Sequence, residues 1–297
     1  MFLKRCGRHF LCSSRTLSLV SRAHIPKDVD AYSDVQSESA GRQTSSLQLS
    51  LPVVIVHGLL GSKTNWNVVA SSMSTKIRQK VYAVDTRNHG ESPHSEIMNY
   101  EVMADDIVEF IRHKRYDRVS LIGHSMGGKA VMTVALRDPD VVEKLVVVDA
   151  SPTYSKRGEE LKFLLEAMQQ LDVSRIFSKT QADEILREDV PNDMIRNFLL
   201  TNLVRSRGTG RFHWKCNLSI LYKSLPTMFD FPQLNSTFTG KTMFIGGARS
   251  GVIGDEQKGD IKRLFPSAEI TTLDTGHWVH AEKPEEFTQI VVRFLTR

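Results

Sequence analysis

Short runs of hydrophobic residues recur along the 297-residue chain and predict buried strands. The runs are Leu51–Val56, Lys80–Val84, Arg118–Ile122, Lys144–Val148, Lys241–Ile245 and Glu269–Leu273. Within each run the hydrophobic residues are nearly continuous and do not alternate strictly with polar ones. This pattern is typical of parallel strands in a sheet that is covered on both faces.

Helical periodicity appears between several of these runs. After Asn99, a suitable N-cap, one apolar helix face is formed by Met103, Ile107, Phe110 and Ile111. Near the C-terminus Pro284 suits a first helical turn, and a second such face follows at Phe287, Ile290, Val291, Phe294 and Leu295. Because strands and helices alternate, we expect an α/β fold with a mostly parallel sheet and right-handed crossovers.

One long interval, residues 151–236, shows no strong strand pattern. It contains helix-like segments at Leu161–Leu171, Gln181–Leu186, Met194–Leu203 and Leu218–Leu225. An interval of about 85 residues is too long for a simple connection in a compact domain. We therefore expect a helical cap at 151–236, inserted into a core made of residues 28–150 and 237–297. The polar segment Asp28–Ser50 is expected to add one or two edge strands to that core.

The formal net charge of +5 is concentrated at the N-terminus. Six of the 39 Lys and Arg residues lie in Met1–Lys27, which has no Asp or Glu, so the remainder carries 33 basic and 34 acidic residues. A nearly neutral remainder gives no reason to expect nucleic-acid binding. The Arg-rich, Ser-containing, acid-free composition of residues 1–27 is typical of a mitochondrial transit peptide and predicts a location in the matrix. A basic disordered tail is the alternative.

The cysteines and the hydropathy restrict the compartment further. Cys6 and Cys12 belong to the predicted leader, and Cys216 alone cannot form an internal disulfide, which suits a reducing compartment. No apolar run approaches about 18 residues, so no transmembrane helix is expected. Nothing in the sequence resembles a metal-ligand cluster or a nucleotide-binding glycine loop, and we expect no cofactor.

The pentapeptide GHSMG, residues 123–127, lies where a predicted strand passes into a predicted helix. A serine on so sharp a turn projects its hydroxyl above the sheet, and glycines two residues before and after it avoid steric clash. The turn also places a helix N-terminus beside the hydroxyl, where negative charge would develop. Ser125 is therefore the predicted nucleophile.

A serine nucleophile needs a base that is oriented by an acid. His277, in the loop after the last predicted strand, is the preferred base, and His280, at the turn toward the final helix, is the competitor. Asp149 is the preferred acid because it ends a predicted strand, and catalytic groups gather at the carboxyl edge of α/β sheets. Asp255, beyond the next predicted strand, is the second candidate for the acid.

The tetrahedral intermediate of acyl transfer needs two aimed hydrogen-bond donors, an oxyanion hole. His57, Gly58 and Leu59 directly follow the first predicted strand. The backbone N–H groups of Leu59 and Met126 are the predicted donors. His57 and Gly58 are expected to shape the loop, in preference to His57 acting as a second base.

Several stretches together resemble the α/β-hydrolase domain-containing protein 11 family. They are HGLLGSKTNW (57–66), VDTRNHGESPHS (84–95), GHSMGGKA (123–130), VVDASP (147–152), LLTNL (199–203) and GHWVHAEKP (276–284). The resemblance spans residues 51–297 and implies the α/β-hydrolase fold with a helical cap. GHSMGG alone is shared with many hydrolases, whereas DTRNHGESPHS beside it is much more specific.

The resemblance implies a carboxylic ester hydrolase, with diacylglycerol-type lipids among the substrates and an association with the mitochondrial 2-oxoglutarate dehydrogenase complex. It implies Ser125 as nucleophile and His277 as base. Relatives with serine at the place of Ser250 use the earlier aspartate, which agrees with Asp149. An acid inside the insertion is disfavoured because Ser219 stands at the corresponding place.

Two other functions compete with ester hydrolysis. Carbon–carbon bond hydrolases of ring-cleavage products share GHSMGG and GHW, so the predicted triad by itself does not exclude them. A binding role, in which the protein stabilises a dehydrogenase complex and catalysis is secondary, is also compatible with an intact triad. Epoxide hydrolases and haloalkane dehalogenases are disfavoured, because their relatives carry aspartate where Ser125 stands.

Overall fold

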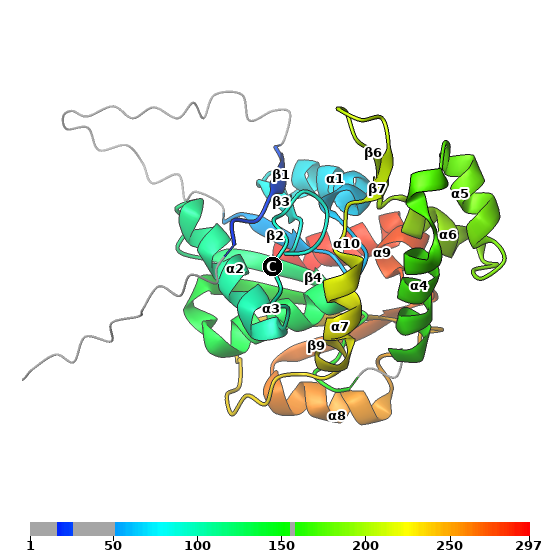
Figure 1. Cartoon of the computed structure of the whole chain (residues 1–297). Coiled ribbons are helices and arrows are strands. Elements are labelled where there is room, and N and C mark those ends of the chain that lie inside the picture. Colours follow the sequence, from blue (N-terminus) through cyan, green and yellow to red (C-terminus); the bar gives the residue numbers. More distant parts are fainter. Residues whose placement is uncertain (1–16, 26–50, 155–157) are drawn as a thin grey trace, which may run out of the picture.

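The computed structural model describes residues 17–25, 51–154 and 158–297 and contains a seven-stranded sheet (Figure 1). Its strands are β1 (Ser21–His24), β2 (Val53–Val56), β3 (Val81–Val84), β4 (Val119–His124), β5 (Val142–Val148), β8 (Lys241–Gly247) and β9 (Ala268–Leu273). Their order across the sheet is β1-β3-β2-β4-β5-β8-β9, and only β1 runs antiparallel to its neighbour. All six predicted strands are thus confirmed, and so is the mostly parallel sheet.

Helices cover both faces of this sheet, which explains the continuous hydrophobicity of its strands. One face packs on α1 (Asn67–Ile77), α9 (Val279–Glu282) and α10 (Pro284–Leu295). The other face packs on α2 (Tyr100–His113), α3 (Met126–Arg137) and α8 (Asp255–Leu264). In β2, for example, Val53 and Ile55 point into the first layer, whereas Val54 and Val56 point into the second. Each strand therefore needs apolar residues at consecutive positions.

The interval 151–236 forms a cap that is largely helical, as the periodicity predicts. Its helices are α4 (Gly158–Gln170), α5 (Lys179–Leu186), α6 (Asp193–Leu200) and α7 (Leu218–Phe229). It also contains an antiparallel hairpin of β6 (Leu203–Arg205) and β7 (Phe212–Trp214), which the sequence pattern does not predict. Strands of three residues are too short to show a hydrophobic period. Short 3-10 turns, η1 (Lys63–Trp66), η2 (Pro139–Val141) and η3 (Val173–Arg175), complete the fold.

Strand β1 lies inside the segment predicted as a leader. The backbone N–H of Leu17 donates to Asp106 Oδ1 at 2.7 Å, and that of Val20 donates to Ser92 Oγ at 2.8 Å. The carbonyl of Val20 accepts from the N–H of Asp85 at 2.8 Å, and the Leu19 side chain is buried. Residues 17–25, which the sequence assigns to the leader, thus pack against the core. Residues 1–16 and the polar segment expected to carry edge strands, 28–50, lie outside the described residues.

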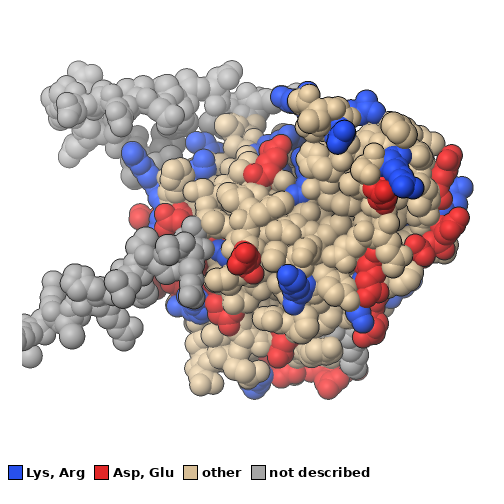
Figure 2. Space-filling view, in the orientation of Figure 1, with Lys and Arg blue, Asp and Glu red and all other residues tan. Residues whose placement is uncertain are grey.

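Charges on the face seen in Figure 2 are interspersed, with lysine and arginine beside aspartate and glutamate and no broad area of one sign. A nucleic-acid surface would instead gather basic side chains on one face. Within the described ranges, none of the helices has the length and apolar character needed to cross a membrane.

Candidate active site

The turn from β4 to α3 holds Ser125 in a backbone conformation that few residues other than glycine adopt, with φ of 53°. Its N–H donates to Val148 O at 2.9 Å, which fixes the turn against the neighbouring strand. A Cβ atom on Gly123 would lie 2.3 Å from Gly127 O, and one on Gly127 would lie 2.3 Å from Val56 O. The two glycines of the pentapeptide are thus required by the close approach of three backbone segments.

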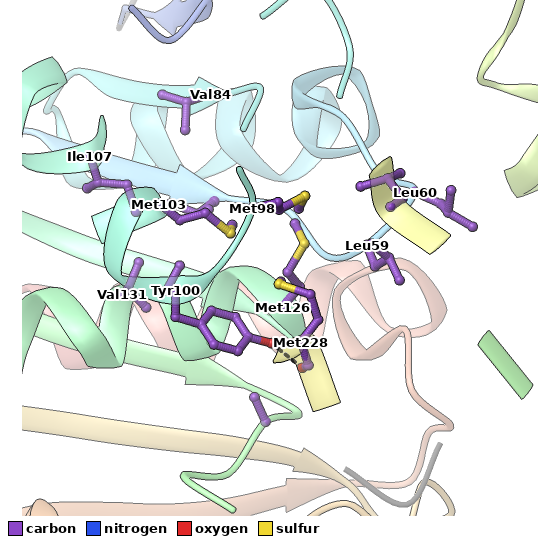
Figure 3. Close-up of a cluster of buried hydrophobic side chains, with 14 of the residues drawn as sticks. Leu59, Leu60, Val84, Met98, Tyr100, Met103, Ile107, Met126, Val131 and Met228 are labelled. Carbon is purple, nitrogen blue, oxygen red and sulfur yellow. Dashed lines mark hydrogen bonds between the residues drawn. The ribbon is translucent and has the colours of Figure 1, made fainter. Parts of the chain in front are cut away.

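The predicted oxyanion donors meet beside this turn. Leu59 follows β2 and Met126 is the first residue of α3; both line the same cavity as Ser125. Both side chains belong to the buried hydrophobic cluster drawn in Figure 3, in which Met126 lies near Met228 of the cap. Among the hydrogen bonds of the described residues, neither the Leu59 N–H nor the Met126 N–H has an acceptor. Two backbone donors are therefore left for a ligand.

His277 and Asp149 are brought together from separate loops. His277 Nδ1 lies 2.6 Å from Asp149 Oδ2 and donates to it. The other carboxylate oxygen, Oδ1, accepts from Gly247 N–H at 2.9 Å and from the Ser250 hydroxyl at 2.7 Å. Both carboxylate oxygens are thus hydrogen-bonded. Asp149 is also fully buried, and its backbone adopts a φ of 45°. These bonds stabilise the ionised form, which is the form that orients an imidazole.

The competing residues have other surroundings. Asp255 begins α8 on the surface and pairs with Lys258. His280 is buried and its ring stacks on Trp66, with centroids 4.0 Å apart and an interplanar angle of 6°. Burial, followed by the neighbouring histidines, lowers the pKa of His280 well below its ordinary value. The carboxylate that faces His277 is therefore that of Asp149 and not that of Asp255, and the imidazole that faces Asp149 is that of His277 and not that of His280.

His124 is a member of the site that the sequence reasoning missed. Its Nε2–H donates to the backbone carbonyl of His277 at 3.0 Å, and the two rings lie 4.7 Å apart. The residue immediately before the predicted nucleophile thus fixes the loop that carries His277. Its place inside the pentapeptide, before Ser125, was the available signal. For Ser250 the resemblance supplies only a correlation with the earlier aspartate. The structure gives the physical reason, because the Ser250 hydroxyl donates to Asp149.

Two cavities meet at Ser125, Leu59 and His277. One lies between the sheet edge and the end of α7, and its wall includes Tyr100, Lys129, Tyr154, Met228 and Phe229. The other lies under α4 and α6 and is more apolar; its wall includes Leu60, Trp66, Leu164, Met194, Phe198 and Trp278. A substrate that occupied both would place its central bond at the serine hydroxyl.

Lys129 and Tyr100 fasten the end of α7 to the core. Lys129 Nζ donates to the carbonyls of Thr153, Phe229 and Asp230 at 2.8 to 2.9 Å. Burial lowers the pKa of Lys129 to about 8, against the attraction of Asp230. The Tyr100 hydroxyl donates to Met228 O at 2.6 Å, the dashed bond in Figure 3. A cation and a hydroxyl thus cap the last carbonyls of the helix and set the wall of the first cavity.

Within residues 17–25, 51–154 and 158–297, no three His, Cys, Asp or Glu side chains converge in a way that could hold a metal ion. The chemistry that the described groups can perform is acyl transfer: a hydroxyl on a strained turn, an imidazole oriented by a carboxylate, and two free N–H donors.

Known proteins share both the sequence and this architecture. The profile of the alpha/beta hydrolase fold matches residues 52–284. A Danio rerio protein named sn-1-specific diacylglycerol lipase ABHD11 is 38% identical over 251 residues, 83% of this chain and 78% of the relative. The Mus musculus protein of that name is 41% identical over 248 residues, 82% of this chain and 80% of the relative.

Similarity extends to bacterial and structurally characterised esterases. Esterase YbfF of Escherichia coli is 32% identical over 247 residues, 82% of this chain and 92% of the relative. The solved structure of a marine microorganism esterase superposes with a TM-score of 0.83 at 32% identity, covering 94% of this chain and 100% of that one. The expected fold and the expected resemblance to the α/β-hydrolase domain-containing protein 11 family are thereby confirmed.

Proposed function

Because the chain belongs to the α/β-hydrolase family and is a carboxylic ester hydrolase, we propose that it cleaves lipid esters through Ser125, His277 and Asp149. The observation that carries the proposal is the 2.6 Å contact of His277 with a buried, doubly anchored Asp149, beside a serine on a strained turn. That combination is the arrangement by which a weak hydroxyl nucleophile is activated.

The proposed reaction has two halves. Ser125 Oγ attacks the ester carbonyl carbon while His277 Nε2 takes the hydroxyl proton, and the Asp149 carboxylate stabilises the imidazolium that forms. The Leu59 and Met126 N–H groups bind the carbonyl oxygen as it becomes negative. His277 then gives the proton to the departing alcohol, leaving an acyl-serine. Water, deprotonated by His277, attacks the acyl-serine; the bond to Ser125 Oγ then breaks, His277 returns the proton to Oγ, and the carboxylic acid leaves.

The two cavities support a substrate with bulk on both sides of the scissile bond. The more apolar cavity under α4 and α6 suits an acyl chain, and the cavity beside Lys129 suits the alcohol portion, since its wall carries more polar groups. Relatives named as diacylglycerol lipases point to a glyceride as that alcohol portion. An ester of a long fatty acid with a substituted glycerol satisfies both walls.

The first test compares the full chain with its Ser125→Ala variant on esters of increasing acyl length and on a diacylglycerol. A Ser151→Ala variant is the matched control, because Ser151 lines the same cavity and its hydroxyl, among the described residues, bonds only to Thr153. We expect Ser125→Ala to lose hydrolysis of every ester and the control to retain it. Equal rates for Ser125→Ala and the unaltered chain would refute the proposal.

Other expectations from the sequence stay predictions. The mitochondrial location is supported by the composition of residues 1–27 and by the resemblance, and the association with a 2-oxoglutarate dehydrogenase complex by the resemblance alone. Supplying cells with Ser125→Ala separates a binding role from catalysis, since a pure scaffold function survives that change. A carbon–carbon bond hydrolase would instead cleave ring-cleavage diketones faster than esters.

A further inference from the structure

Two buried histidines that are not part of the triad hold the loop that carries one oxyanion donor. We propose that His57 and His89, each as a neutral imidazole with its proton on Nδ1, are positioning residues that aim the Leu59 N–H at the developing oxyanion. The inference rests on the proposed function, because an oxyanion hole has a purpose only in acyl transfer.

The first step concerns one peptide group. The Leu59 N–H and the Gly58 carbonyl belong to the same planar unit and point in opposite directions, so fixing one fixes the other. Gly58 O accepts from His57 Nδ1 at 2.8 Å and from Gly61 N–H at 2.9 Å. With its carbonyl held by two donors, the peptide directs the Leu59 N–H away from them.

The second step assigns the tautomers from the partners. His57 Nε2 lies 3.1 Å from the N–H of Thr86, which can only donate, so Nε2 accepts and the proton is on Nδ1. In His89, Nε2 accepts from Leu60 N–H at 3.1 Å, and Nδ1 donates to Arg87 O at 2.9 Å. Both histidines use the same tautomer.

The third step concerns charge. A proton on either Nε2 would face a backbone N–H, so these contacts require neutral rings. Burial lowers the pKa of His57, against the opposing attraction of Asp85. Burial, followed by the nearby His57, lowers the pKa of His89 to about 3. Both rings are shielded from solvent and lie 5.1 Å apart in an edge-on arrangement.

The loop needs such support because Leu60 is held in the left-handed region, at φ of 61°. This conformation is unfavourable for a residue with a side chain, and it persists only when the surroundings impose it. His89 holds the N–H of Leu60, and the Asn202 side-chain amide donates to its carbonyl at 2.7 Å. The loop is thus gripped by the chain after β3 and by the base of the cap.

The test exploits the geometry of amide side chains. An asparagine places its amide near the position of Nδ1 and a glutamine places it near Nε2. His57→Asn keeps a donor for Gly58 O, whereas His57→Gln keeps only an acceptor for Thr86 N–H. His89→Gln keeps the acceptor for Leu60 N–H, whereas His89→Asn does not. The inference therefore expects opposite orders: kcat of Asn above Gln at position 57, and of Gln above Asn at position 89.

We expect the poorer variant of each pair to lose about 10- to 100-fold in kcat with little change in KM, since removal of a whole donor costs about 100- to 1000-fold. Affinity for an alkyl boronic acid, whose serine adduct mimics the tetrahedral intermediate, should fall by a similar factor. Urea unfolding supplies the stability of each variant. A merely structural role would lower stability without separating kcat from KM.

The outcomes are distinct. If the unaltered chain neither hydrolyses esters nor binds the boronic acid, the proposed function fails. If the unaltered chain does both, but the amide variants show the same order at the two positions or equal kcat, the inference is overturned. If all four variants keep the native kcat and boronate affinity, the histidines do not position the donor.

Discussion

Replacement of Asp149 by asparagine tests the proposed acid directly, because the hydrogen-bond donors around the carboxylate determine which way the asparagine amide is oriented. Asp149 Oδ1 accepts from Gly247 N–H and from the Ser250 hydroxyl, whereas Oδ2 accepts from His277. An asparagine has one acceptor oxygen, and it is best placed at the Oδ1 position. Its NH2 group then faces His277 Nδ1.

That orientation forces the wrong tautomer on the histidine. His277 Nδ1 must become an acceptor, so the ring proton moves to Nε2, and Nε2 can no longer take the proton of Ser125. We expect kcat to fall about 10⁴-fold, which corresponds to about 5 kcal/mol of lost transition-state stabilisation. Ser125 and both oxyanion donors are untouched, so KM should change little.

The assay is the initial rate of hydrolysis of a soluble acyl ester, with urea unfolding to confirm that Asp149→Asn is folded. Asp255→Asn is the matched control, since that carboxylate is on the surface and paired with Lys258. The control should keep the native rate. Retention of more than about a tenth of the activity by Asp149→Asn, with loss in Asp255→Asn, would refute the assignment of the acid.

Three further predictions follow from the packing. Removal of residues 1–27 should lower the free energy of unfolding by at least about 3 kcal/mol relative to removal of residues 1–16. The larger deletion removes three hydrogen bonds, from Leu17 and Val20 to Asp106, Ser92 and Asp85, and each contributes about 1 kcal/mol. Equal urea midpoints of the two truncated proteins would contradict this. Gly127→Ala should leave no folded, active protein at 37 °C, since its Cβ would lie 2.3 Å from a strand carbonyl; native circular dichroism and activity would show that the turn can relax. The free energy of unfolding should fall as the pH drops from 6.5 to 5, because histidines whose pKa is lowered in the folded state bind protons in this range only when the protein unfolds. Each such group contributes up to about 1.4 kcal/mol per pH unit, and His89→Gln should make the dependence of stability on pH shallower.

Much of the core could be predicted from the sequence because its signals are local. A strand buried on both faces must be apolar at consecutive positions, and that property is visible in Val53–Val56 without any partner strand. The sharp turn at Ser125 could also be predicted from the sequence, since Gly123 and Gly127 avoid steric clashes close to the serine. His277 followed from its place after the last strand.

The remaining features depend on contacts between distant parts of the chain. The Arg-rich composition of the N-terminal segment predicts a leader and carries no sign of a strand, because residues 21–24 gain backbone partners only when β3 is beside them. Likewise the choice between Asp149 and Asp255 depends on which carboxylate the fold brings to His277, and sequence position alone left both open.

The sequence by itself therefore determined the class of fold and predicted the nucleophile and the base, because hydrophobic periodicity and short-range sterics act within a few residues. Only the tertiary structure decided which acid faces His277 and that residues 21–24 pair with β3. It alone also placed His57 and His89 around the loop of Leu59, since a hydrogen bond such as that from Leu60 N–H to His89 spans 29 positions of the chain. Contacts of that range exist only once the strands have paired and the cap has closed over them.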